Sequence, residues 1–153
     1  MAVHVVLFQP QIPNNTGNIG RLCVGTDCVL HLIKPLGFEI TDTQVKRSGL
    51  DYWPHLTYHV HDSFEDFIKD FNPEQLYLFT AHATASIWDT SFSLEQDVFL
   101  IFGREADGLP ETITSKYSNQ QLFIPMFSHR VRCYNLANAV AMAVMEVKRQ
   151  FNT

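Results

Sequence analysis

The chain has 153 residues, of which 46% are hydrophobic and 18% charged, a balance that suits one compact domain with its own core. It holds no run of about 18 or more apolar residues, so no membrane span is expected, and its apolar N-terminus lacks the basic region of a signal peptide. The net charge of −5 by itself argues mildly against nucleic acid as a partner, although the arginines gather in loops and could form a local basic surface.

Short apolar strands alternate with helices along the chain. Strands are predicted at residues 4–8, 29–35, 55–61, 75–81, 98–103 and 121–125. Helices are predicted at 18–27, 63–71, 109–117 and 135–151, the third with Pro110 in its first turn. This order predicts an α/β fold, a mostly parallel sheet with helices on both faces. No repeat or linker interrupts it, so residues 1–153 are expected to form a single domain.

Three polar loops follow predicted strands, where open α/β sheets bind their ligands. They read "NNTGNIGR", "GREADGLP" and "IPMFSHRVRCYN". The first is compatible with an ordinary loop in which an asparagine or Thr16 caps a helix, and equally with a ligand loop in which Arg21 meets an anion. The second is either a plain strand-to-helix turn or the lining of an adenosine pocket, with Glu105 holding a polar group. Neither GxGxxG nor a Walker loop is present, which disfavours a dinucleotide-dependent enzyme.

The histidines and cysteines indicate little chemistry of their own. His55, His59 and His61 could bind a metal, but no nearby carboxylate or cysteine completes a tetrahedral set, and a solvated strand edge is the preferred interpretation. The three cysteines, at positions 23, 28 and 133, are odd in number and form no CxxC pair, which predicts a reducing cytoplasm. Cys133 has no identifiable histidine and acid partner, so we interpret it as a small residue that lines a pocket and not as a nucleophile. No metal site is expected.

The last predicted helix, "NLANAVAMAVMEVKRQF", is apolar on more than one face. A surface helix needs only one apolar stripe, so this helix is either central or buried by a second subunit. We favour a homodimer.

Three motifs in order, "IPNNTGNIGRL", "IFGREADGLP" and "IPMFSHRVRCYNLANAVA", resemble those of the SPOUT RNA 2′-O-methyltransferases. The small single-domain TrmL/YibK type is similar along nearly the whole chain, including "LHLIKPLGF" and "RSGLDYW". The resemblance implies a SPOUT-type fold with a C-terminal trefoil knot and a homodimer that buries the last helix. It also implies S-adenosylmethionine as cofactor and methyl transfer to the ribose 2′-OH of the tRNA wobble nucleotide, cytidine or uridine 34, in the anticodon stem-loop. DNA and membranes are not expected partners.

The resemblance also assigns residues. It implies catalytic roles for Arg21, Asn15 and Asn135. The implied cofactor-binding residues are Phe79, Thr80, Gly103, Glu105, Ile124, Met126, Cys133 and Leu136. Basic residues expected to contact RNA phosphates are Lys46, Arg47, Arg130 and Arg132. The family usually has serine where Cys133 stands, and often where Ala137 stands; a thiol is the weaker hydrogen-bond partner.

Two alternatives stay open at this point. The chain could be a non-catalytic RNA- or nucleotide-binding α/β protein of the same fold, or it could methylate another RNA position. Arg21 has two possible roles as well: a base assisted by the substrate phosphate, or a phosphate ligand that stabilises the developing alkoxide.

Overall fold

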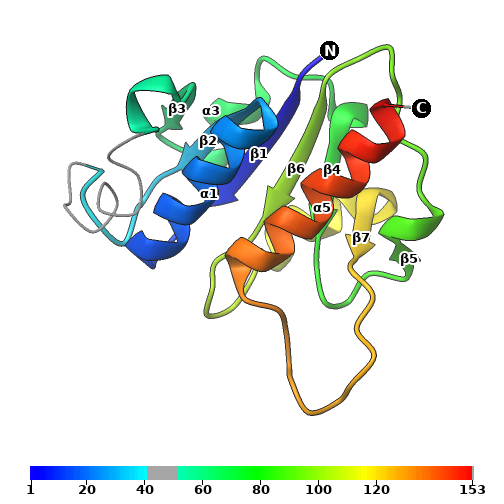
Figure 1. The fold of residues 1–153 in the computed structure, drawn as a ribbon. Coiled ribbons are helices and arrows are strands. Elements are labelled where there is room, and N and C mark those ends of the chain that lie inside the picture. Colours follow the sequence, from blue (N-terminus) through cyan, green and yellow to red (C-terminus); the bar gives the residue numbers. More distant parts are fainter. Residues whose placement is uncertain (41–51, 153) are drawn as a thin grey trace.

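Within the part of the chain that the structure describes, a seven-stranded sheet, parallel throughout, forms the middle layer (Figure 1). The computed structural model describes residues 1–40 and 52–152. The strand order is β3-β2-β1-β6-β4-β7-β5. The strands are β1 (Val3–Phe8), β2 (Cys28–Ile33), β3 (Tyr58–His61), β4 (Leu76–Phe79), β5 (Ala85–Ser86), β6 (Val98–Phe102) and β7 (Gln121–Phe123).

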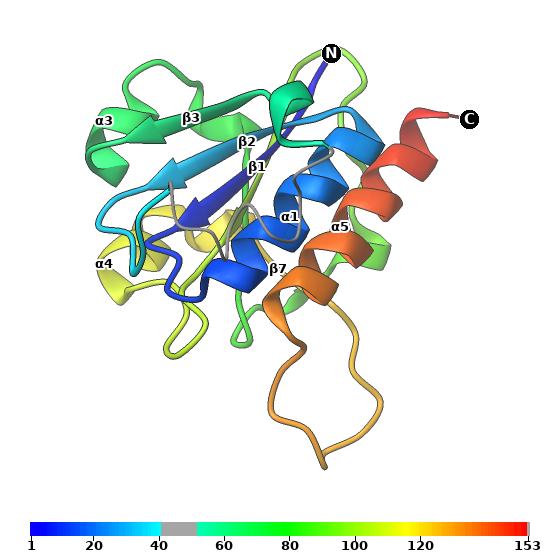
Figure 2. The same ribbon diagram turned by 60° about the vertical axis from the view of Figure 1, so that its left-hand side comes forward.

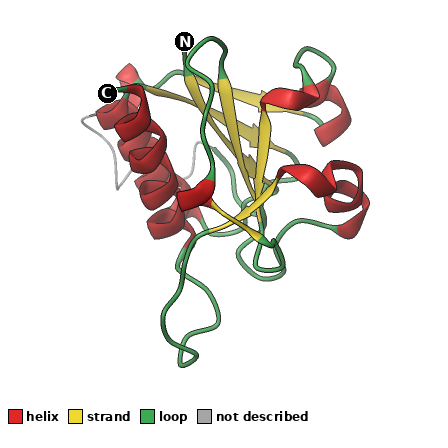
Figure 3. Cartoon of the chain, turned by 90° about the vertical axis from the view of Figure 1, so that its right-hand side faces the viewer, coloured by secondary structure: helices red, strands yellow, loops and turns green. Residues whose placement is uncertain are grey.

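Helices cover both faces of the sheet, as predicted. Helices α1 (Pro13–Thr26) and α5 (Leu136–Phe151) lie side by side on one face. Figures 2 and 3 show α3 (Phe64–Ile68) and α4 (Glu111–Thr114) on the opposite face. Short 3-10 helices span Trp53–His55, Pro73–Gln75, Ile87–Asp89 and Ser115–Gln120. The fold is therefore a three-layer sandwich whose middle strands are hidden from water.

Strand β1 supplies both hydrophobic cores. Val3, Val5 and Leu7 point to the side of α1 and α5, whereas Val6 and Phe8 point to the side of α3 and α4. All six residues of β1 are buried. A parallel strand covered on both faces needs apolar side chains in both directions, which explains why its sequence is apolar at every position except His4.

Three predicted elements differ most from the structure. Helix α1 begins at Pro13 rather than at residue 18, so Asn15 and Thr16 lie inside its first turns instead of capping it. The residue before it, Ile12, gives no side-chain cap. The predicted helix 109–117 is only one α-helical turn, α4, continued as a 3-10 helix to Gln120, with Pro110 as its N-cap. The predicted strand 55–61 shortens to β3, which is the edge strand of the sheet, as expected.

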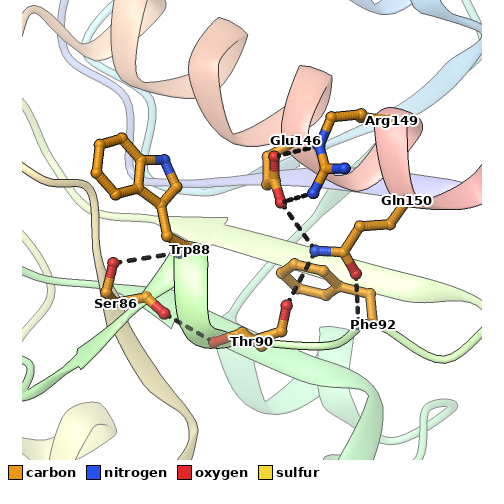
Figure 4. A network of polar contacts seen from close by, with 7 residues as sticks. All are labelled: Ser86, Trp88, Thr90, Phe92, Glu146, Arg149 and Gln150. Atoms are coloured by element: carbon orange, nitrogen blue, oxygen red, sulfur yellow. Dashed lines mark hydrogen bonds and ion pairs between the residues drawn. The ribbon is translucent and has the colours of Figure 1, made fainter.

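The C-terminal end of α5 is fastened to the segment that follows β5 (Figure 4). Gln150 receives a hydrogen bond from the backbone N–H of Phe92 at 3.0 Å and donates to the carbonyl of Thr90 at 2.9 Å. The same side-chain amide donates to Glu146 at 2.9 Å, and Glu146 pairs with Arg149. One amide thus joins α5 to backbone about 60 residues away in the chain.

Within residues 1–40 and 52–152, no helix is long and apolar enough to cross a membrane.

Candidate functional site

The carboxyl ends of the central strands bring two predicted cofactor-binding residues, Phe79 and Thr80, close to the start of the loop that follows β6. Phe79 ends β4 and pairs in register with Phe102 at the end of β6, and their rings stack with centroids 4.8 Å apart. Thr80 follows Phe79, and its N–H donates to the carbonyl of Leu122 in β7 at 3.0 Å. Its hydroxyl donates to Gln121 Oε1, also at 3.0 Å. Phe79 and Thr80 therefore stand where β4, β6 and β7 end, and the cofactor contacts expected of them stay a prediction.

The loop after β6 folds back tightly on its first residue. A Cβ on Gly103 would lie 2.2 Å from the carbonyl carbon of Gly108, so no other residue fits there. Gly108 has a φ of +71°, a conformation that glycine adopts without strain. Backbone hydrogen bonds between Arg104 and Gly108 run in both directions, at 3.2 and 2.9 Å. The loop itself therefore requires both glycines, independently of any ligand.

Glu105 in this loop caps the N-terminus of α1. Its carboxylate accepts hydrogen bonds from the backbone N–H groups of Gln11 (3.0 Å) and Ile12. A negative charge at this end of a helix is favourable, because the unpaired N–H groups there carry partial positive charge. The Gln11 side chain in turn accepts from Ala106 N–H at 3.2 Å. The cofactor contact expected of Glu105 stays a prediction. The structure adds a role that the sequence did not indicate, because Glu105 joins the loop after β6 to the start of the first motif.

Asn15 and Asn135 meet, although 120 positions separate them. Asn135 Nδ2 donates to Asn15 Oδ1 at 3.2 Å. Asn135 is also the N-cap of α5, and its Oδ1 accepts from the backbone N–H of Ala137 (2.9 Å) and Asn138 (3.3 Å). Asn15 is only 8% exposed. The first turns of α1 and α5 are therefore joined by one side-chain hydrogen bond, which places two of the three predicted catalytic residues in contact.

Arg21, the third, lies farther along α1 and is exposed. The turn before it is clamped by Tyr52, whose hydroxyl donates to the carbonyl of Gly17. Tyr52 and Trp53 pack against Gly20, where an added Cβ would lie 3.4 Å from both rings and 3.2 Å from Leu56. Burial raises the pKa of Tyr52, so its hydroxyl stays protonated and able to donate. Arg21 thus projects from a rigid helical turn into solvent, where an anionic ligand can reach it.

The segment from Ile124 to Asn135 projects away from the rest of the molecule (Figures 1 and 2). At its base, Ile124 and Leu136 pack against the core beneath α5, and Tyr134 donates to the carbonyl of Pro125 at 2.7 Å. Met126 is half-buried, whereas Arg130, Arg132 and Cys133 are exposed. The structure thus places Ile124 and Leu136 near the strand ends and Cys133 on the projecting segment. Lys46 and Arg47 lie outside the described residues.

An apolar groove of about 530 Å³ runs between α5 and this segment. Trp88 and Phe127 line it with 63% and 84% of their surfaces exposed, and their ring centroids are 5.9 Å apart. Met142 and Met145 line the α5 side. The sequence indicated the apolar face of this helix but not the groove, because Trp88 lies in a segment without periodicity.

The cysteines and histidines form no metal cluster within the described ranges. Cys23, Cys28 and Cys133 are free. Burial raises the pKa of the Cys23 and Cys28 thiols, which makes them inert packing residues.

Comparison with known proteins gives the family and the fold. Residues 2–145 match the SpoU rRNA Methylase family. A relative from Acidovorax sp. (strain JS42), described as tRNA (cytidine(34)-2'-O)-methyltransferase, is 41% identical over 150 residues, which are 96% of this chain and 91% of that relative.

Two solved structures extend the comparison. One, described as "Structural insights into the 2-OH methylation of C/U34 on tRNA", is 40% identical with a TM-score of 0.90 and covers 99% of this chain and 97% of its own. The other, AviRb from Streptomyces viridochromogenes in complex with AdoMet, is 21% identical with a TM-score of 0.85 over 97% of this chain and 57% of its own. At that identity the second structure shows the fold alone.

Proposed function

The chain belongs to the SpoU rRNA methylase family, and we propose that it transfers a methyl group from S-adenosylmethionine to the ribose 2′-OH of the tRNA wobble nucleotide, cytidine or uridine 34. The observation that carries the proposal is likeness over nearly the full length to relatives described by that reaction, 41% identity over 96% of the chain in one case. Contact between Asn15 and Asn135 near the strand ends supports it from the structure. The free cysteines are consistent with action in the cytoplasm.

The residues present fit the cofactor. The half-buried Phe79, Ile124 and Leu136 offer apolar walls at the margin of the core. Gly103 keeps the backbone of its loop free of side-chain bulk, and Thr80 and Asn135 supply polar groups beside these walls. Apolar walls with a few polar groups beside them suit the adenosine moiety of a cofactor. We propose that these residues, with Met126 and Cys133 on the projecting segment, hold S-adenosylmethionine, whose sulfonium supplies an electrophilic methyl group.

Arg21 is proposed to position the RNA. A guanidinium does not lose its proton in proteins, so binding the substrate phosphate and stabilising the developing alkoxide is the role that its chemistry favours. Its exposure on α1, above a turn fixed by Tyr52, suits both tasks. Transfer from a sulfonium is an in-line displacement, and most of the rate is expected from orientation. Arg130 and Arg132 are exposed on the projecting segment and are proposed to contact RNA phosphates of the anticodon stem-loop, as are Lys46 and Arg47.

A homodimer is proposed to bury the exposed face of α5. Met142 and Met145 are 39% and 58% exposed, and Trp88 continues the apolar surface across the groove. Exposed apolar surface of this kind marks an interface more often than it faces water. Sedimentation equilibrium tests the assembly: a 17.5 kDa species at micromolar concentration would rule it out.

A C-terminal knot is proposed from the strand order. Strand β7 fills the position between β4 and β5, both of which precede it in the chain. Helix α5 then returns across the sheet to pack beside α1. A chain that inserts between two earlier, connected strands has the opportunity to thread their connection. Continuous electron density through residues 79–136 in a crystal structure decides whether it does.

The direct test is transfer of labelled methyl from S-adenosylmethionine to unmodified tRNA, followed by nuclease mapping of the labelled nucleotide. Label at the wobble ribose is the expected result. Label at another RNA position would keep the reaction and overturn the site. Absence of label, with calorimetry still showing binding of S-adenosylhomocysteine, would leave a binding protein without transferase activity.

A further inference from the structure

Three histidines from three neighbouring strands form a hydrogen-bonded row. His4 in β1 and His31 in β2 approach with Nδ1 and Nε2 at 2.9 Å, and His31 Nδ1 lies 2.9 Å from His61 Nε2 in β3. At the other end, His4 Nε2 lies 3.0 Å from Asp97 Oδ2. We call these four residues the histidine row. It lies on the α3 side of the sheet, away from the candidate methyltransferase site.

Aromatic rings enclose the middle of the row. His4 stacks on Phe99 with centroids 4.1 Å apart, and Phe67 meets both His31 and His61 edge-on. His4 and His31 are 9% and 3% exposed. Ordinary packing does not explain three polar rings in this setting, because a buried imidazole is costly unless both of its nitrogens find partners. Here the rings satisfy one another.

The row is not arranged as a metal site. His31 uses opposite ring nitrogens, Nε2 toward His4 and Nδ1 toward His61, so the three rings point along a line and do not converge on one point. A metal ion requires ligand atoms that converge. What such a line can bind is a proton.

The position of Asp97 fixes which nitrogen of each ring carries the hydrogen. A carboxylate only accepts, so the proton between Asp97 and His4 lies on His4 Nε2. The Nδ1 of neutral His4 must then accept from His31 Nε2–H, and by the same logic His31 Nδ1 accepts from His61 Nε2–H. All three imidazoles are therefore Nε2–H tautomers, and every bond of the row donates toward Asp97.

We propose that the histidine row is a proton-binding site that takes up one proton as a unit and holds the charge on His4 beside Asp97. A proton that arrives at Nδ1 of His61 releases the Nε2 proton of His61 to His31 Nδ1. His31 then passes its Nε2 proton to His4 Nδ1. His4 ends with both nitrogens protonated, while His31 and His61 are neutral Nδ1–H tautomers. Each of the hydrogen bonds survives with its direction reversed, except that His4 still donates to Asp97.

A second proton cannot be accommodated in the same way. If His4 and His61 both carried a charge, each would direct an N–H at His31, which has no neutral form that accepts at both nitrogens. One hydrogen bond of the row must then break. The groups around the row act on its protonation in both directions. Asp97 favours a positive charge on His4, and Asp66 and Asp70, from α3 and the residues after it, favour one on His61. His59 opposes a positive charge on all three rings. The positive charge of the N-terminal amino group also helps to keep Asp97 ionised.

The titration behaviour of the single groups supports this picture. Burial lowers the pKa of His31 to about 3, and burial also lowers the pKa of His4 and His61. A hydrogen bond from the backbone N–H of Ala2 lowers the pKa of Asp97, which keeps the carboxylate ionised and the row directed. Of the three rings, only His4 is hydrogen-bonded to a carboxylate within the described residues.

The test is the tautomeric state of each ring, read from long-range ¹H–¹⁵N spectra of the full chain across pH. At neutral pH we expect Nε2–H at His4, His31 and His61. On acidification we expect His4 to become imidazolium while His31 and His61 change together to Nδ1–H, with one shared midpoint. Separate midpoints for the rings, or charge appearing first on His61, would overturn the proposal.

A matched variant sharpens the test. In Asp97→Asn the side-chain oxygen can keep the bond from Ala2 N–H, which turns the amide nitrogen toward His4 Nε2. His4 must then accept there, so all three rings are expected as Nδ1–H already at neutral pH, and the midpoint of proton uptake falls by about one pH unit or more, a tenfold weaker proton affinity.

The control is His59→Gln, because His59 lies beside His31 with ring centroids 5.3 Å apart and stands outside the row. We expect it to leave every tautomer unchanged. A tautomer at His61 that does not respond to Asp97→Asn would show that the rings titrate independently. The spectra require no methyltransferase activity, so this proposal fails or stands separately from the proposed function.

Discussion

Asn135 Nδ2 and Asn15 Oδ1 lie 3.2 Å apart and join the first turn of α5 to the first turn of α1. The same Asn135 side chain caps α5 through its oxygen. One amide therefore serves two elements at once: the oxygen satisfies the open end of its own helix, and the nitrogen satisfies a nearly buried acceptor on the other. The amide is well suited to this because it carries a donor and an acceptor in one plane.

Replacement of Asn135 separates these two tasks. Asn135→Ala should lower the free energy of unfolding by about 1–3 kcal/mol, because the cap is lost and Asn15 loses its partner. Asn135→Ser keeps a capping oxygen but is too short to reach Asn15, so it should lose only the second part. Urea unfolding of both variants and of Asn15→Ala measures the difference; a serine variant as stable as the wild type would mean that the contact between the two asparagines carries no stability, and equal costs for serine and alanine would mean that the cap carries none.

Glu105→Gln tests whether this carboxylate caps α1. The amide keeps one oxygen but loses the charge and one acceptor, so the free energy of unfolding should fall by about 1–2 kcal/mol. Denaturation by urea reports this loss, and calorimetry with S-adenosylhomocysteine reports any contact to the cofactor. Glu111→Gln is the control, since Glu111 lies in the first turn of the much shorter α4. A variant that unfolds like the wild type yet binds cofactor weakly would assign Glu105 to the ligand alone.

Arg21→Lys should abolish most of the methyl transfer while the fold is unchanged. Arg21 is exposed, so little packing is lost, but lysine lacks the planar fork that binds a phosphate through two parallel hydrogen bonds. We expect the rate to fall by about 100-fold or more, the effect typical of removing an oxyanion-stabilising donor. Single-turnover transfer to tRNA measures it, beside unchanged binding of S-adenosylhomocysteine. The control is Arg149→Lys, in the last turn of α5, at the end of that helix away from Asn135. Near-normal turnover of Arg21→Lys would show that Arg21 takes no part in the reaction.

Stability should fall on mild acidification, because the folded chain holds His31 neutral. Burial lowers the pKa of His31 from 6.5 to about 3. Between these two values the unfolded chain takes up a proton that the folded chain refuses, so stability is complete above about pH 6.5 and decreases as the pH falls toward 3. Each unit of lowered pKa corresponds to about 1.4 kcal/mol. Urea midpoints between pH 7.5 and 4.5 test this direction; His82→Gln, at an exposed histidine, should leave the profile unchanged.

The sequence predicted those strands and helices that are determined by residues close together in the chain. The apolar strands β1, β2 and β6 and the apolar helix α5 were readable, because burial leaves a signature within a few residues. The start of α1 was not readable, because its cap is Glu105, which is distant in sequence. Nor was the histidine row, since His4 and His31 each stand alone inside an apolar strand. Only the parallel register of β1, β2 and β3 brings the rings together.

Gln150→Glu should loosen the C-terminal end of α5 in a manner that depends on pH. In the wild type, the amide nitrogen of Gln150 donates to the carbonyl of Thr90 and to the carboxylate of Glu146 (Figure 4). In the variant at neutral pH, a carboxylate faces these two acceptors instead. The loss of these donors should cost about 2 kcal/mol. When the new carboxyl is protonated it regains an O–H donor, and its pKa in the folded chain is therefore raised. Its penalty should shrink as the pH falls below about 5.

Gln150→Ala separates this effect from simple loss of the side chain, because alanine cannot titrate and its penalty should not depend on pH. Urea unfolding of both variants at pH 7.5 and pH 4 provides the comparison. Equal penalties for the glutamate variant at the two pH values would mean that the amide nitrogen of Gln150 contributes nothing. The hold on backbone 90–92 would then come from its oxygen, through the bond that it accepts from Phe92 N–H.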